Sequence, residues 1–439
     1  MLLPLLSEAD PKTSAEGSVD PLGTYAIADS LGVRLVPGVR ERQAHPRFLT
    51  SIAVSHSLCA DFPEDALARD GVSEPWQVFE WTFVEGMVRT AIDPAQLRGL
   101  PGQEKARRTI EDKARLSAKR YLKNPAVVGF HGVYRILARD IEVERADRLG
   151  EFGYELVSTW EKEQGLVGFT GTLEGPGKDV RRQLIDAVRE GMEKGAVARS
   201  AGWSGFQFFS RHMEIRGAGK KESRLIARRL LDTSGGYRGE VLNCLTSPEG
   251  KELWSREREG KSLSERRFHE LLSKSGSRQL QELLNAIGIY EEFSRLLQDA
   301  FDACLLNLSK DQKRVHPSRL AGLEGVKRAA QKVPEIFGPV AEQLTPFGHG
   351  VRFQEAFRDL ADRLSLTEWV ERLLEHHCKV QRTKPPAGKA PWFDRFDDGS
   401  CMVRSAYLQN GIVPMDDRYV HAYRTRSLWS FALDLGLVK

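Results

Sequence analysis

The spacing of apolar residues along the chain predicts a protein built mainly from α-helices. Apolar side chains recur every three or four residues, the pattern of a helix with one buried face, over 47–62, 75–90, 127–138, 149–163, 351–364 and 367–377. The longest stripe runs over 279–308. Alternating, strand-like runs are short. We therefore expect a mainly α fold with small β elements, in which helical bundles are combined with winged-helix modules.

Turn-forming residues predict where these elements end. Gly32 is expected to stop a first helix over 24–31, and Pro334 and Pro339 to separate two later helices. The glycine-rich stretch 165–177 contains neither GxxxxGK[ST] nor GxGxxG, so we interpret it as a linker between domains rather than a phosphate-binding loop.

The length of the chain predicts several domains. At 439 residues it exceeds one ordinary hydrophobic core. From the composition shifts we expect a flexible tail over 1–19, an N-terminal helical domain over 20–165 with a winged-helix unit, a central helical domain over 178–379, and a small C-terminal module over 380–439.

Composition narrows the class of protein further. Hydrophobic residues make up 41% and charged residues 29% of the chain, which is typical of globular domains. The five cysteines are widely spaced and form no CxxC pair, so neither a zinc ribbon nor a disulfide framework is indicated. Because no secretory signal or membrane-spanning apolar run is found, we expect a cytoplasmic protein with no membrane partner.

Basic clusters are the main candidates for binding. The net charge of +4 is mild, yet positive side chains gather over 104–123 and 211–229 and in the proline-containing loop 380–389. Such clusters bind phosphates, although many are only solvated faces. The first cluster is expected to form a basic helix, and two short helices follow it, as in a winged-helix or helix-turn-helix unit. The predicted DNA- or RNA-binding residues are Lys105, Arg107, Arg108, Lys119, Arg120, Lys123, Lys220, Lys221, Arg224, Arg228, Lys384 and Lys389.

Two other groups of residues have competing interpretations. Arg40, Arg42 and Arg47 are suited to phosphates, or to carboxylates and helix ends inside the fold, and the second is favoured. Aromatic residues over 76–83 and 429–431 are suited to helix packing, or to partner surfaces of an assembly protein without nucleic acid.

The C-terminal region contains the residues for an enzymatic alternative. Asp394, Asp397 and Asp398 are candidate Mg²⁺ ligands of a metal-dependent nuclease site, in which His377 would act as a base and Lys389 or Arg404 would stabilise phosphate charge. The competing interpretation is a plain hairpin turn at 397–399, since Asp-Gly favours turns. We favour the turn. His56, His131 and His212 are interpreted as core or surface groups, and no metal or cofactor is predicted.

The order of several short motifs resembles a family of uncharacterised bacterial proteins encoded in phage-defence gene clusters. These motifs are Asp20-Pro21-Leu22-Gly23, Pro37-Gly38-Val39, Arg47-Phe48-Leu49, Tyr290-Glu291, Asp299-Ala300-Phe301-Asp302, Lys389-Ala390-Pro391-Trp392 and Tyr423-Arg424. None is catalytic, so no catalytic residue is implied. The resemblance implies a non-catalytic nucleic-acid-binding or scaffold subunit of a multi-protein antiviral complex, with the other subunits as partners.

Overall fold

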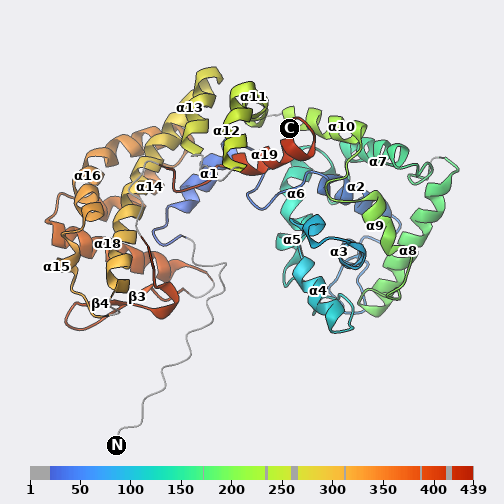
Figure 1. Ribbon diagram of the computed structural model, residues 1–439, viewed down its shortest axis with the longest axis horizontal. Coiled ribbons are helices and arrows are strands. Elements are labelled where there is room, and N and C mark those ends of the chain that lie inside the picture. Colours follow the sequence, from blue (N-terminus) through green and yellow to red (C-terminus); the bar gives the residue numbers. More distant parts are fainter. Residues whose placement is uncertain are drawn as a thin grey trace, which may run out of the picture. The chain divides into compact units, whose positions relative to one another are not determined.

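A computed structural model gives the structure of the chain, and it is mainly helical (Figure 1). It describes residues 20–171, 173–232, 236–258, 265–310, 313–385, 388–411 and 418–438, so the predicted tail over 1–19 lies outside the described residues. Within them there are nineteen α-helices and two small antiparallel hairpins. The expected mainly α fold with small β elements is thereby confirmed.

The chain folds into two compact units, each built from segments far apart in sequence. Unit 1 contains Met1–Leu31 and Ser264–Ala422, and unit 2 contains Gly32–Leu263 and Tyr423–Lys439. Helix α1 (Tyr25–Leu35) begins in unit 1 and ends in unit 2. This division does not follow the boundaries expected from the sequence, because 165–177 lies inside unit 2 and 380 lies inside unit 1.

Unit 2 packs short helices around an aromatic core. Its elements are α2 (Phe48–Cys59), α3 (Pro75–Thr90), α4 (Gln103–Glu111), α5 (Pro125–Val128), α6 (Phe130–Asp140), β1 (Glu144–Arg145), β2 (Arg148–Leu149), α7 (Glu151–Glu163), α8 (Pro176–Lys194), α9 (Phe206–His212), α10 (Lys220–Leu231), α11 (Arg238–Thr246), α12 (Pro248–Arg258) and α19 (Thr425–Asp434).

Helix α3 is the centre of that core. Pro75 begins it at the first helical turn, as the sequence predicts. Phe79 and Phe83 lie edge-on to Phe209 of α9, with ring centroids 6.1 Å and 5.3 Å apart. Gly86 is required at this crossing, because a Cβ there would meet the Phe209 ring at 2.7 Å. The aromatic stretch of α3 therefore packs inside unit 2. Trp429 and Phe431 of α19 are also buried, so these aromatics do not form the exposed partner surface considered above.

Arg47 shows which of its two interpretations holds. Its side chain is buried and pairs with Glu222 of α10, and it also donates to the carbonyl oxygens of His212 and Glu214. The guanidinium thus binds a carboxylate and the backbone carbonyl oxygens at and just after the end of α9, inside the fold. This pair ties the start of α2 to α10 across a long stretch of sequence.

Unit 1 is organised by a long helix. Its elements are α13 (Glu265–Ser275), α14 (Arg278–Lys310), α15 (Pro317–Leu320), α16 (Glu324–Leu344), α17 (Gly350–Phe357), α18 (Leu366–Thr383), β3 (Phe393–Arg395) and β4 (Cys401–Val403). The apolar stripe predicted over 279–308 is the buried face of α14, which packs along α16. The two prolines were wrongly expected to separate helices. Pro334 and Pro339 both lie inside α16, where packing against α14 outweighs the backbone hydrogen bonds that proline cannot make.

Three other local predictions need correction. Helix α1 continues through Gly32 to Leu35, because buried Leu31, Leu35 and Val36 extend its apolar face past the glycine. The basic stretch over 104–123 is helical only to Glu111. The glycines of 165–177 serve close backbone packing, since a Cβ on Gly175 would lie 2.2 Å from the carbonyl oxygen of Val167. Thr172 of that stretch lies outside the described residues.

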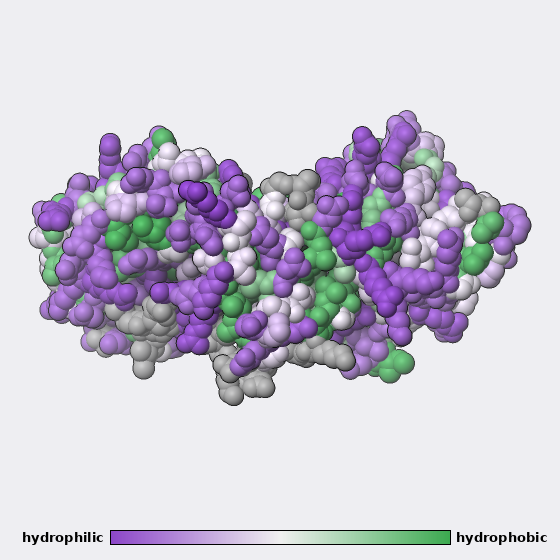
Figure 2. Space-filling view, turned by 90° about the horizontal axis from the view of Figure 1, so that it is seen from above, coloured by the Kyte–Doolittle hydropathy of each residue, from purple (hydrophilic) through white to green (hydrophobic). Residues whose placement is uncertain are grey.

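The visible surface of each unit is mostly polar. Hydrophilic side chains cover most of the face shown in Figure 2. The most exposed large apolar residues are Ile92, Val72 and Val351, and no two of them are neighbours in the sequence. No described helix has the length and apolarity needed to cross a bilayer.

Candidate functional site

An open groove in unit 2 brings together three exposed arginines from distant parts of the chain. It has a volume of about 910 Å³, and Arg98, Arg216 and Arg426 all line it. Arg98 precedes α4, Arg216 precedes α10, and Arg426 lies in the first turn of α19. We call this feature the arginine groove. Only tertiary folding unites these guanidiniums, which are 118 and 210 residues apart in successive pairs, from 98 to 216 and from 216 to 426.

Two buried tryptophans line the arginine groove. Trp254 and Trp429 stack at 24° with ring centroids 6.0 Å apart, and they are 3% and 4% exposed. Indoles so deeply buried cannot stack on a base. They line the groove together with the exposed arginines. A ligand therefore meets guanidinium groups first, which favours recognition of anionic oxygen atoms.

His45 fixes one side of the groove. Its Nδ1 lies 2.6 Å from Oδ2 of Asp434, and its Nε2 lies 2.7 Å from the carbonyl oxygen of Arg98. Gly99 permits this contact, because its φ of +92° and its missing Cβ let the loop pass directly over the imidazole. Asp434 is the only carboxylate among the described lining residues, and His45 already engages it, so these residues present an excess of positive charge.

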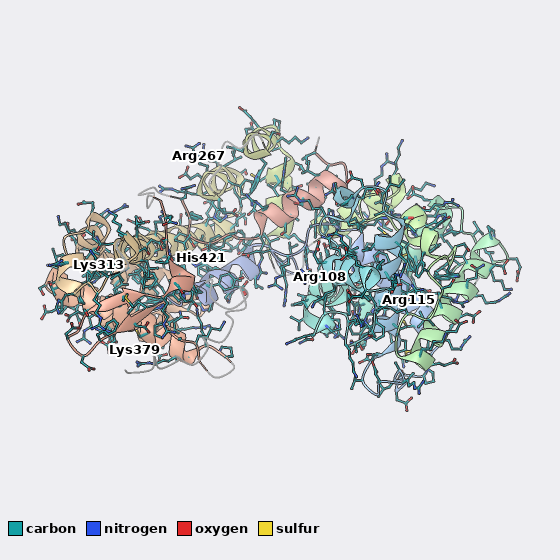
Figure 3. All side chains as sticks on the ribbon, turned by 60° about the horizontal axis from the view of Figure 1, so that its bottom comes forward. Arg108, Arg115, Arg267, Lys313, Lys379 and His421 are labelled. Atoms are coloured by element: carbon teal, nitrogen blue, oxygen red, sulfur yellow. The ribbon has the colours of Figure 1, made fainter. Side chains whose placement is uncertain are left out.

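The predicted basic residues of unit 2 form separate surfaces. Figure 1 shows α4 and α10 at opposite ends of unit 2. On the α4 side, Arg107 pairs with Glu104 and Arg120 with Asp112. Arg115, labelled in Figure 3 with Arg108, donates to buried Glu85 at 2.6 Å. The side chains of Lys105, Arg108, Lys119 and Lys123 are exposed and form no hydrogen bond or ion pair with a described residue.

Helix α10 presents a second basic face. Lys220, Lys221, Arg224 and Arg228 are exposed, while Leu225, Ile226 and Leu230 of the same helix are buried. Arg228 pairs with Glu155 of α7 at 3.1 Å. The structure therefore brings these four together on one face, but not with the α4 residues.

The last two predicted binding residues lie in unit 1. Lys384 follows α18 and donates its ammonium to the carbonyl oxygen of Asp20 at 2.5 Å, and Lys389 is half-buried with its backbone N–H bound to Gln381. Pro386 and Ala387 between them lie outside the described residues. Lys384 is thus engaged in holding the chain segment before α1.

The C-terminal aspartates lie in a hairpin, as the turn interpretation predicted. Strands β3 and β4 pair antiparallel, and 397–399 form the turn between them. Asp394 pairs with Arg404 at 2.8 Å, and Asp398 accepts hydrogen bonds from Ser400. Within the described part of the chain, these aspartates are not among the groups close enough to share a metal ion. The geometry gives no support to a nuclease site here.

His377 is likewise committed to structure. Its Nδ1 donates to the carbonyl oxygen of Pro21 at 2.9 Å, and its Nε2 accepts from the backbone N–H of Trp392 at 3.0 Å. A second proton on Nε2 would face that N–H. Burial lowers the pKa of His377 to about 4. With both nitrogens engaged, this side chain has no free lone pair for use as a general base.

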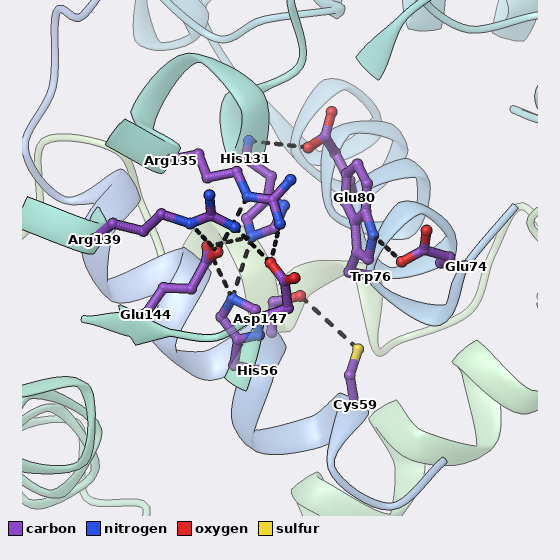
Figure 4. A network of polar contacts seen from close by, with 11 residues as sticks. His56, Cys59, Glu74, Trp76, Glu80, His131, Arg135, Arg139, Glu144 and Asp147 are labelled. Atoms are coloured by element: carbon purple, nitrogen blue, oxygen red, sulfur yellow. Dashed lines mark hydrogen bonds and ion pairs between the residues drawn. The ribbon is translucent and has the colours of Figure 1, made fainter. Parts of the chain in front are cut away.

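A buried polar cluster in unit 2 was not foreseen from the sequence (Figure 4). Nε2 of His56, on α2, lies 3.2 Å from Nε2 of His131, on α6. Oε2 of Glu144, on β1, lies 3.3 Å from the first nitrogen and 3.4 Å from the second. We call these three residues the His-His-Glu cluster. They are the one group in the described residues that meets the distance requirement for a shared metal ion.

Two arginines of α6 hold the carboxylate of the cluster in place. Oε1 of Glu144 accepts from Nε of Arg135 at 3.1 Å and from Nε of Arg139 at 2.8 Å. Both guanidiniums also contact Asp147. The β1–β2 turn makes this possible, because Ala146 and Asp147 both adopt positive φ, the geometry of a tight hairpin. Glu144 thus points inward and Asp147 bridges the arginines.

The surroundings shift the pKa values of two members of the cluster, Glu144 and His131. Burial alone would raise the pKa of Glu144, but contacts with His131, His56 and Arg139 outweigh it and lower that pKa. Burial lowers the pKa of His131, which keeps its imidazole neutral. Both shifts favour the unprotonated forms of Glu144 and of the His131 ring, which are the forms that can bind a cation.

Local sequence patterns could not have revealed either site. His56 and His131 are 75 residues apart, and no HxxxH or HExxH spacing links them. Glu144 is one acidic residue among many. The best available signal was its place before the Ala146-Asp147 turn, which marks a hairpin that would point alternate side chains inward.

Comparisons with known proteins give no match. No protein-family model, no curated protein and no solved structure matches the chain. The geometry of the two sites therefore carries the functional argument.

Proposed function

We propose that unit 2 binds nucleic acid through the sugar–phosphate backbone, and that the arginine groove is the primary contact. The observation that carries this proposal is the convergence of Arg98, Arg216 and Arg426 on one groove, where the single carboxylate among the described lining residues is already paired. Guanidinium groups bind phosphate oxygens in bidentate fashion. The exposed basic face of α10 begins four residues after Arg216 and gives unit 2 further exposed positive charge.

The chemistry of the groove favours binding without sequence preference. Contacts from arginine to phosphate position a nucleic acid but do not read its bases. The buried tryptophans offer no exposed ring face to stack on a base. A winged-helix arrangement of α6, the β1–β2 hairpin and α7 stays a prediction, and the proposal does not depend on it.

The test is a salt-dependent binding measurement on the full chain. Fluorescence anisotropy would follow labelled single-stranded RNA, single-stranded DNA and duplex DNA of one sequence. We expect the Arg98→Glu/Arg216→Glu variant to lose at least about tenfold in affinity. The slope of log affinity against log salt should fall by about 2, since each lost phosphate contact removes roughly one released counterion.

A matched control separates the groove from general charge. Arg182→Glu/Arg189→Glu reverses the same number of charges on exposed α8 positions of unit 2. Its affinity should stay within about twofold of wild type, because salt largely screens exposed charges that do not contact the ligand. Equal losses in both variants would reduce the effect to net charge, and no binding of any probe by wild type would reject the proposal.

The same protein would serve as a non-catalytic subunit of a multi-protein antiviral system. This part of the proposal is supported by the resemblance to proteins of phage-defence gene clusters. Co-purification with the products of neighbouring genes, followed by an absorbance spectrum, tests it. Partners with bound nucleic acid support both parts, partners without it favour pure assembly, and isolation as a lone chain counts against a complex.

A further inference from the structure

The three side-chain atoms of the His-His-Glu cluster form a nearly equilateral triangle. Its edges are 3.2 Å, 3.3 Å and 3.4 Å. Zinc binds nitrogen and oxygen ligands at about 2.0–2.1 Å in tetrahedral geometry, which places neighbouring ligand atoms about 3.3–3.4 Å apart. The right angles of an octahedral site would bring the same atoms to about 3.0 Å apart. The observed triangle fits one face of a tetrahedron better.

Hydrogen bonds alone do not account for this triangle. A neutral imidazole carries one ring proton, so each Nε2 is either a donor or an acceptor. If both nitrogens donate to Glu144, two donors stand 3.2 Å apart with no bond between them. If one of them accepts instead, its lone pair faces the carboxylate oxygen. A cation on the side where the three lone pairs meet makes all three contacts favourable.

From this geometry we infer that His56, His131 and Glu144 bind a divalent transition metal ion, with Zn²⁺ as the best match. Two imidazoles and one carboxylate are a ligand set that zinc accepts, and no thiolate is needed. The ligands come from α2, α6 and β1, so the ion would join three elements that are separate in sequence. This inference does not depend on the proposed nucleic-acid binding.

The surroundings of the cluster have the features of an outer ligand shell. Arg135 and Arg139 bind Oε1 of Glu144 and leave Oε2 for the ion, which fixes the carboxylate in one orientation. Trp76 packs on His131 with ring centroids 4.6 Å apart and limits rotation of that imidazole. The backbone N–H of His131 donates to Glu80, which anchors the start of α6.

Three protein ligands leave one position of a tetrahedral ion for another group. Within the described residues, no fourth histidine, cysteine or carboxylate joins the cluster. The side chains of His56, His131 and Glu144 are only 7%, 5% and 0% exposed. The remaining position therefore suits water or a small anion rather than a large substrate.

The test begins with the wild-type full chain, freed of metal with a chelator and then given Zn²⁺. Competition against a chromophoric chelator should show one tight site per chain. Thermal unfolding should shift to higher temperature with Zn²⁺, because an ion that binds only the folded state stabilises it. Co²⁺ in place of Zn²⁺ should give the intense visible absorption of tetrahedral nitrogen and oxygen coordination.

Variants then assign the ion to these residues. His56→Ala and Glu144→Gln should each weaken Zn²⁺ binding by at least about a hundredfold, more than the 10- to 100-fold typical of outer-shell changes. Arg139→Gln should produce a smaller loss. His212→Ala removes a histidine of the same unit outside the cluster and should bind Zn²⁺ like wild type.

Each result decides the question. A folded wild type without stoichiometric Zn²⁺ binding overturns the inference, as does unchanged affinity in folded His56→Ala and Glu144→Gln. A cobalt spectrum with thiolate charge-transfer bands would place the ion on a cysteine and also overturn it. If the variants fail to fold, the wild-type stoichiometry and cobalt spectrum decide alone.

Discussion

The two units contain buried histidines that are used in different ways. In unit 1, His376 and His377 bind the carbonyl oxygens of Leu22 and Pro21, and His421 pairs with Glu291 and Thr24. Each of those imidazoles faces its own partners. In unit 2, His56 and His131 face each other and share one carboxylate oxygen. Burial alone therefore does not identify a histidine as a metal ligand. The close approach of several potential ligand atoms does.

Buried ion pairs occur in both units, but different buried groups offer the sharpest test of each unit. Unit 2 contains the buried pair Arg47–Glu222, whose side chains are 3% and 0% exposed. In unit 1, the buried rings of His376 and His377 on α18 hydrogen-bond to backbone carbonyl oxygens. We therefore test unit 2 by removing the cationic partner of Glu222, and unit 1 by lowering the pH around His377.

The largest expected effect is in unit 2. Arg47→Met keeps much of the side-chain volume but leaves Glu222 buried without its cationic partner. Breaking a buried ion pair in this way costs about 3–5 kcal/mol. Hydrogen exchange read peptide by peptide should show faster exchange in α2 and α10, with little change in α14. The control Arg182→Met alters an exposed α8 arginine, and a comparable loss there would contradict the assignment.

A middle-sized effect is expected in unit 1 at low pH. The pKa of His377 is about 4 in the folded chain, against a usual value of 6.5, and burial lowers the pKa of His376 as well. The unfolded state therefore binds protons first, so this stability is present above pH 6.5 and is lost as the pH falls from 6.5 toward 4. The loss from His377 alone amounts to about 2 kcal/mol at pH 5.

Denaturant unfolding of the full chain at neutral pH and at pH 5, monitored by hydrogen exchange in α18 peptides, measures this loss. Lys384 is the cation that opposes protonation of His377, together with His376. A His377→Asn variant should be less stable at neutral pH but should show a flatter pH dependence. An unchanged slope would show that the titrating group lies elsewhere.

The smallest expected effect is at the start of α18, the helix that presents both histidines. The Ser365 hydroxyl accepts from the backbone N–H of Glu368, and the Glu368 side chain returns to the backbone N–H of Ser365. Removing such a cap with Ser365→Ala costs about 1 kcal/mol. Ser365→Asp keeps an acceptor and should stay near wild type in the same exchange measurement. Equal effects of both substitutions would mean that the cap is not the cause.

Periodicity determined the helices that later proved correct. The apolar stripe of α14, the start of α3 at Pro75 and the Asp-Gly turn of the C-terminal hairpin depend on neighbours within a few residues, so the sequence was sufficient to predict them. Local signals misled where packing outweighed them. Pro334 and Pro339 stay within α16 because the helix packs along α14.

The sites were decided by the tertiary structure alone. Arg98, Arg216 and Arg426 line one groove, and His56, His131 and Glu144 meet at one point, only because distant segments pack together. The sequence determined that the chain is mainly helical with strongly basic stretches, since helix periodicity and charge are local properties. It could not determine which charges stay exposed, which are paired, and which lone pairs converge, because those depend on distances across the fold.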